Sequence, residues 1–136
     1  MKIKKISHNE VKPLIKFSKN DVVCLKDTKT TEWFGLYEPN LVGVAGVIIK
    51  SGKGRIRGVF VLPEKRKKKY GSQLMSYIIE YMESKGVNYI DQLSSHPDWW
   101  IKNGWSVKSI VKNGDIVIFI GAGDISSIAR EIVQDI

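Results

Sequence analysis

The most informative stretch of this chain is Val59-Phe60-Val61-Leu62-Pro63-Glu64-Lys65-Arg66-Lys67-Lys68-Lys69-Tyr70-Gly71-Ser72-Gln73-Leu74. Its β-branched and aromatic beginning predicts a strand, which Pro63 ends. Five consecutive cations follow, from Lys65 to Lys69. From Leu74 to Met82, apolar residues recur at spacings of one, three and four, which predicts an amphipathic helix. The stretch is therefore interpreted as a strand, a basic turn and a helix.

This junction has the properties of an anion site. Backbone N–H groups at a helix N-terminus attract phosphate, and the small Gly71 lets a diphosphate approach them closely. The five cations add positive charge to a chain whose formal net charge is +8. Such a charge favours phosphate-bearing or polyanionic partners, including nucleic acid. The plainer alternative is that the cations form a solvated loop.

Four strands and one helix are predicted upstream of the basic turn. The predicted strands are residues 2–7, 32–37, 41–50 and 55–62. A helix follows the first strand, because Ser7 and Glu10 have the spacing of a capping box and apolar residues then recur at helical spacing. Pro13 would interrupt a helix that begins so early, which leaves its start open.

Downstream, the helix should end at Gly86, and the pattern then predicts a strand at 87–93 and a short helix at 97–104. Strands at 105–111 and 115–120 form a hairpin across Asn113-Gly114. From Asp124 to Ile136, apolar residues form one stripe of a last helix. That stripe could pack on the chain's own sheet or on a second copy, so a monomer and a homodimer both remain open.

Length and composition bound the class of protein. A chain of 136 residues, 43% hydrophobic and 26% charged, suits one domain with one core. No apolar run approaches the ~20 residues of a membrane span, and the basic N-terminus lacks the apolar segment of a signal peptide. We therefore expect a cytoplasmic protein without membrane contact. Cys24 is the only cysteine, so we expect neither an internal disulfide nor a thiolate-rich metal site, and no metal.

Residues 59–74 resemble the cofactor motif of the GNAT superfamily of acyl-CoA N-acyltransferases. That motif reads Arg/Gln-x-x-Gly-x-Gly/Ala after a strand that ends in a Pro-acidic pair, and Arg66, Tyr70 and Gly71 fit it. The late stretch Trp99-Trp100-Ile101-Lys102-Asn103-Gly104-Trp105 is similar to the family's aromatic-aromatic-x-Lys-x-Gly-aromatic signature. The predicted element order also matches, and the resemblance covers residues 2–120.

The resemblance implies an α+β fold. A single GNAT-like domain would span residues 1–120, with a mixed, mostly antiparallel sheet of six to seven strands and helices on both faces. Residues 121–136 would add the amphipathic helix. Acetyl-CoA or another acyl-CoA would be the co-substrate, its pantetheine arm paired with strand backbone and its diphosphate held by the basic loop. The implied cofactor-binding residues are Val59, Phe60, Val61, Arg66, Lys67, Lys68, Lys69, Tyr70, Gly71 and Ser72.

The sequence departs from the family's pattern at functional positions. Lys69 stands where the first glycine is usual, and its Cβ narrows the approach to the loop backbone. Trp100 stands where many members place a tyrosine that protonates the departing thiolate, and an indole N–H cannot serve as an acid. Neither Arg55 nor Arg57 can replace the glutamate that acts as general base in some members.

His96 and Asp98 are the candidate catalytic side chains. They follow the strand at 87–93, on the edge where the resemblance places the acceptor and the thioester. A histidine there could accept the amine proton near neutral pH. The alternative is that His96 is a solvated loop residue and that Asp98 caps the short helix. In either case, alignment of the amine with the thioester would supply part of the rate enhancement. The resemblance also implies that the backbone N–H of Val61 is the oxyanion donor, which would supply a further part.

Three functions are compatible with these observations. The leading hypothesis is an N-acyltransferase, chiefly an acetyltransferase, in which an amine attacks acyl-CoA directly within a ternary complex. The net charge of +8 favours, as an alternative, acyl-CoA-dependent modification of nucleic acid or of a nucleic-acid-bound protein. Trp100 and the missing base favour a non-catalytic acyl-CoA-binding module. The sequence specifies neither the acceptor nor the acyl chain.

Overall fold

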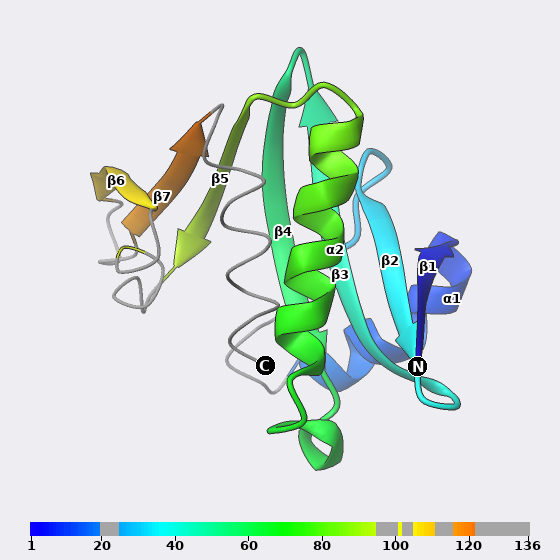
Figure 1. Cartoon of the computed structure of the whole chain (residues 1–136). Coiled ribbons are helices and arrows are strands. Elements are labelled where there is room, and N and C mark those ends of the chain that lie inside the picture. The colour runs from blue at the N-terminus through cyan, green and yellow to red at the C-terminus, as the bar shows by residue number, and fades with distance from the viewer. Residues whose placement is uncertain (20–24, 95–100, 102–104, 111–115, 122–136) are drawn as a thin grey trace.

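The computed structural model describes residues 1–19, 25–94, 101, 105–110 and 116–121. Within these residues the chain forms one sheet of seven strands in the order β1-β2-β3-β4-β5-β7-β6 (Figure 1). Neighbouring strands are antiparallel except β4 and β5, which are parallel. The strands are β1 (Lys2–Ile6), β2 (Glu32–Tyr37), β3 (Leu41–Lys50), β4 (Lys53–Val61), β5 (Tyr89–Ser94), β6 (Ser106–Ile110) and β7 (Ile116–Gly121). The helices are α1 (His8–Ser18), the 3-10 turn η1 (Pro63–Lys65) and α2 (Tyr70–Ser84).

The two α-helices cover opposite faces of the sheet, so the expected α+β class with helices on both faces is confirmed. The helix α2 makes the crossover that the parallel pair β4 and β5 requires, and it lies along the front of the sheet in Figure 1. Alternate residues of each strand face the two helices. The α2 side includes Phe34, Leu36, Ala45, Leu74, Ile78 and Met82. The α1 side includes Val11, Leu14, Trp33, Val44 and Phe60.

The start of α1 follows the capping-box prediction. The Ser7 side chain accepts a hydrogen bond from the Glu10 N–H at 3.2 Å, and the Glu10 carboxylate accepts one from the Ser7 N–H at 3.2 Å. The helix begins at His8, and Pro13 lies inside it. Proline removes one helical hydrogen bond. The capping box and the burial of Val11 and Leu14 offset this cost.

Other boundaries follow from turn chemistry. The helix α2 ends where predicted, because Gly86 takes a φ of 80° that glycine adopts without strain. The strand β4 starts at Lys53, two residues before the predicted position, and β6 starts at Ser106, after the buried Trp105.

None of the helices in the described ranges has the length and apolar composition that a membrane crossing requires.

Some sequence predictions lie outside the residues that the structure describes. They concern the short helix at 97–104, the turn at Asn113-Gly114 and the helix at 124–136, apart from the single residue Ile101. The candidate catalytic residues His96 and Asp98 also lie outside, as do Trp100 and Cys24.

Candidate acyl-CoA site

The candidate site begins where β4 and β5 separate. The two strands pair from Lys53 opposite Tyr89 to Ile56 opposite Gln92. At this point the β3–β4 register shifts between Gly46 and Val47, so that Arg57 is an extra residue in β4. Past it, β5 slants away from β4 (Figure 1). A gap therefore opens beside the last residues of β4.

The backbone of β4 presents hydrogen-bonding groups to this gap. Leu62 donates its N–H to the Val42 carbonyl at 2.8 Å, on the β3 side. Because the backbone groups of a strand alternate in direction, those of Val59 and Val61 point to the opposite side, into the gap. Arg66 Nε donates to the Val61 carbonyl at 2.9 Å, and the guanidinium carbon lies 5.4 Å from the centre of the Phe60 ring. Arg66 thus ties the basic turn to the edge of the gap.

The basic turn is shaped by two lysines with positive φ. Lys67 has a φ of 65° and Lys69 a φ of 64°. Lys69 is the N-cap of α2 and lies in the left-handed region, with a ψ of 17°. An L-residue adopts this region at a cost, whereas glycine does not. This explains physically why the family motif has a glycine at this position. In this chain a lysine adopts the left-handed conformation instead.

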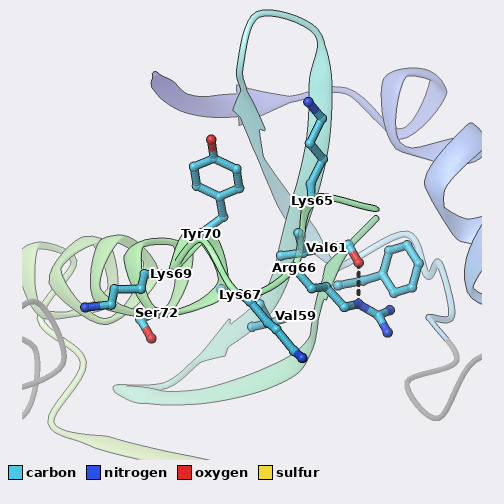
Figure 2. A pocket seen from close by; sticks show the side chains of 10 residues that line it. Val59, Val61, Lys65, Arg66, Lys67, Lys69, Tyr70 and Ser72 are labelled. Atoms are coloured by element: carbon cyan, nitrogen blue, oxygen red, sulfur yellow. Dashed lines mark hydrogen bonds between the residues drawn. The ribbon is translucent and has the colours of Figure 1, made fainter. Parts of the chain in front are cut away.

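A pocket of about 650 Å³ lies between the basic turn, the start of α2 and the end of β4 (Figure 2). Nine of the ten residues that the sequence predicted as cofactor-binding line it, and Lys68 does not. Lys65 lines the pocket although the prediction omitted it. The run of five cations contained this signal, but which of them face the pocket depends on the dihedral angles of the turn. The lining residues are Val59, Phe60, Val61, Lys65, Arg66, Lys67, Lys69, Tyr70, Gly71 and Ser72.

The chemistry of this pocket fits the diphosphate end of acyl-CoA. Four of its residues are cations, and the first turn of α2, whose free N–H groups carry partial positive charge, has no acidic residue. A Cβ built at Gly71 would contact only Val61 Cγ2, at 3.9 Å, so the helix start is open to a bulky anion. Gln92 is the last β5 residue that pairs with β4, and its buried Nε2 has no hydrogen-bond partner among the described residues. An acceptor atom of a ligand in the gap would satisfy this donor.

Two further polar clusters lie outside the pocket. Arg55 and Asp91, which sequence patterns did not pair, form a bidentate ion pair across β4 and β5 at 2.7 and 3.1 Å. Asp27 accepts hydrogen bonds from Trp33 Nε1 at 2.9 Å and lies 2.6 Å from His8 Nδ1, which ties α1 to the loop before β2. Within the described ranges, no group of His, Cys, Asp and Glu side chains is arranged to hold a metal ion.

The model of the Acetyltransferase (GNAT) family matches residues 6–98, more than half of the chain. No curated protein sequence matches this chain. The fold is similar to the ribosomal-protein-S18-alanine N-acetyltransferase from Escherichia coli, with a TM-score of 0.73 and 10% identity over 88% of this chain and 92% of that one.

Two other structures are similar to this fold. The PaiA N-acetyltransferase from Thermoplasma acidophilum, solved in complex with coenzyme A, has a TM-score of 0.68 and 16% identity, covering 88% of this chain and 98% of that one. The aminoglycoside 6'-N-acetyltransferase from Enterococcus faecium has a TM-score of 0.70 and 15% identity, covering 89% and 97%. At these identities the structures establish the fold alone. With the family match over residues 6–98, the conclusion is that this chain belongs to the acetyltransferase (GNAT) family.

Proposed function

We propose that this protein transfers an acyl group, most simply acetyl, from acyl-CoA to an amine acceptor. The observation that carries the proposal is the continuity between two features. A cationic pocket lies at the N-terminus of α2, and its wall is formed by the same β4 residues whose backbone groups face the gap. One ligand with a diphosphate at one end and an extended amide-bearing arm at the other matches both.

The basic turn and the first turn of α2 would hold the diphosphate. Val59 and Val61 would pair with the amides of the pantetheine arm, although the Val61 carbonyl already accepts from Arg66. From Val61 back to Arg57 is four residue steps, about 13 Å at the rise of a strand. An arm that follows β4 over this length would end where β5 closes the gap, beside Arg57 and Gln92.

The proposed reaction forms an amide bond between the amine nitrogen and the acyl carbon, breaks the thioester C–S bond and expels CoA as a thiolate. One amine proton passes to a base and from the base to the thiolate sulfur, so that CoA leaves as a thiol. Bound acyl-CoA supplies the activated carbonyl. The chain would align the two reactants at that end of β4. Because Val61 lies about 13 Å from it, the Val61 N–H would pair with the arm and not with the thioester carbonyl, which differs from the sequence expectation. We propose His96 as the proton acceptor and Asp98 as the second candidate catalytic residue. Their role stays a prediction, as does the division into a domain at 1–120 and a helix at 121–136.

The experiment that tests the proposed function has two readouts on the full chain. Calorimetric titration with acetyl-CoA measures binding, and a thiol reagent measures CoA release with a panel of neutral, anionic and cationic amines. We expect binding and amine-dependent thiol release. Binding without release on every amine would instead support a non-catalytic acyl-CoA module, and absence of binding would overturn the proposal.

A further inference from the structure

A positively charged surface lies on the face of the sheet opposite α2. Ile49 and Ile56 pack toward α2, so alternation turns their neighbours on β3 and β4 to the opposite face. These neighbours include Lys50 and Arg55. Arg57 follows Arg55 by two residues, in the bulge that interrupts the alternation, and its side chain is exposed. A pocket of about 350 Å³ lies on this face. Its charged lining residues are three cations, Lys50, Lys53 and Arg55, and one carboxylate, Asp91. That pocket is lined by Ile48, Lys50, Ser51, Lys53, Gly54, Arg55 and Asp91.

The two arginines of this surface differ in their partners. Arg55 binds both oxygens of Asp91, whose side chain is only 8% exposed. This carboxylate is therefore committed to Arg55. Arg57 is exposed and makes no hydrogen bond or ion pair with any residue that the structure describes. Among the described residues, none therefore occupies the guanidinium of Arg57, and it can bind an anionic ligand.

The position of Arg57 is set by the strand irregularity. It is the extra residue of the bulge in β4, directly after Ile56, the last residue that pairs with β5. Bulges redirect a side chain relative to a regular strand. Arg57 therefore lies at the closed end of the gap, where the thioester would arrive. A planar guanidinium with fixed donors suits carboxylate and phosphate groups, which it binds with two parallel hydrogen bonds.

We propose that the amine acceptor carries a carboxylate or phosphate group and that Arg57 binds this group. The inference rests on the proposed function, because it takes the closed end of the gap as the place where amine and thioester meet. Lys50 and Lys53 extend the positive charge along the same face. A polycationic acceptor would find no uncommitted carboxylate among the described residues that line this pocket, since Asp91 is paired.

The test compares amines that differ only in the anionic group. Chemical-shift titration of isotope-labelled protein, with saturating non-reactive CoA, measures the affinity for β-alanine against its amide and for phosphoethanolamine against ethanolamine. The first pair reports on carboxylate and the second on phosphate. In at least one of the two pairs, we expect the anionic amine to bind about tenfold more tightly than the neutral one. Tenfold is the scale of one charge-assisted hydrogen bond.

Variants assign this preference to one side chain. Arg57→Gln should remove the tenfold preference, and Arg57→Lys, which keeps the charge without the planar fork, should retain part of it. Lys2→Gln removes the same charge from the exposed start of β1, three strands away, and should bind like the parent protein. Equal affinity for both members of each pair, or a preference that survives Arg57→Gln, would overturn the inference.

Repeating the titration without CoA separates this inference from the proposed function. If the protein does not bind CoA, the proposed function fails, yet a preference lost in Arg57→Gln still supports an anion site at Arg57. If acetyl transfer occurs only to neutral or cationic amines, the proposed function stands and the inference is wrong. Binding of a short single-stranded RNA that depends on Arg57, with no binding of either small anion, would also overturn it.

Discussion

Replacing Lys69 with glycine should stabilise the protein while removing a cation. The left-handed conformation of Lys69, with φ of 64° and ψ of 17°, costs an L-residue about 1–2 kcal/mol. Glycine avoids this cost but loses about 0.5–1 kcal/mol through the greater freedom of the unfolded chain. The difference predicts that the free energy of unfolding rises by about 0.5–1 kcal/mol. The Lys69 side chain is exposed, so little packing is lost.

Lys68→Gly is the matched control. It removes the same charge from the same turn, but Lys68 is not among the residues with positive φ. It should therefore lower the free energy of unfolding by about 0.5–1 kcal/mol, the ordinary cost of glycine. Lys69→Ala removes the charge and keeps the Cβ, so it should give no gain. The difference between the two glycine variants isolates the left-handed conformation and should be about 1–2 kcal/mol.

Urea unfolding followed by tryptophan fluorescence measures these values. Trp33 and Trp105 are buried and report on loss of the core. The midpoints of the three variants give the differences directly when the slopes of their transitions agree. If Lys69→Gly destabilises the protein as much as Lys68→Gly does, Lys69 is not left-handed, and the explanation for lysine at this position is refuted.

Three further predictions concern the scaffold of the site. Gly46→Ala should cost about 1–3 kcal/mol by thermal or urea unfolding, because its Cβ would lie 2.6 Å from the buried Trp33 ring; an unchanged midpoint would contradict this close contact. Asp27→Ala should cost about 1–3 kcal/mol, because it leaves the Trp33 N–H without its acceptor, and a neutral result would show that another group replaces it. Burial opposes ionisation of Glu32, but hydrogen bonds, led by that from Tyr81 at 2.6 Å, outweigh it and hold the pKa of Glu32 below 4.5. The ionised Glu32 therefore stabilises the fold above its unfolded pKa, and this contribution is lost as the pH falls through the folded pKa. Glu32→Gln should make the free energy of unfolding depend less on pH in the acid range. An unchanged dependence would refute the pairing of Glu32 with Tyr81.

The parts of the fold that the sequence predicted are those determined by neighbours along the chain. The capping box of Ser7 and Glu10 spans one helical turn and fixes the start of α1. Gly86 ends α2 because its own backbone conformation is one that glycine adopts freely. The strand–turn–helix of residues 59–74 combines such local signals, and its resemblance to the GNAT cofactor motif identified nine of the ten residues that line the pocket.

What the sequence could not predict depends on distance in the chain or on exact dihedral angles. Arg55 and Asp91 are 36 residues apart and meet only because β4 and β5 are adjacent and parallel. The bond from Arg66 Nε to the Val61 carbonyl depends on the 3-10 turn that lies between the two residues. The positive φ angles of Lys67 and Lys69 are not predicted by any residue pattern in a run of lysines. The position of Arg57 in a bulge likewise depends on the register between β3 and β4.

Binding of acetyl-CoA to Gly71→Glu protein is the most direct test of the claim that the N-terminus of α2 holds the diphosphate. A Cβ at position 71 meets only Val61 Cγ2, at 3.9 Å, so neither Gly71→Glu nor the control Gly71→Ala should disturb the fold. The glutamate places negative charge and bulk against the diphosphate. Calorimetric titration should show no binding to Gly71→Glu and clear binding to Gly71→Ala. Parent-like affinity of folded Gly71→Glu protein would contradict the account and place the ligand elsewhere.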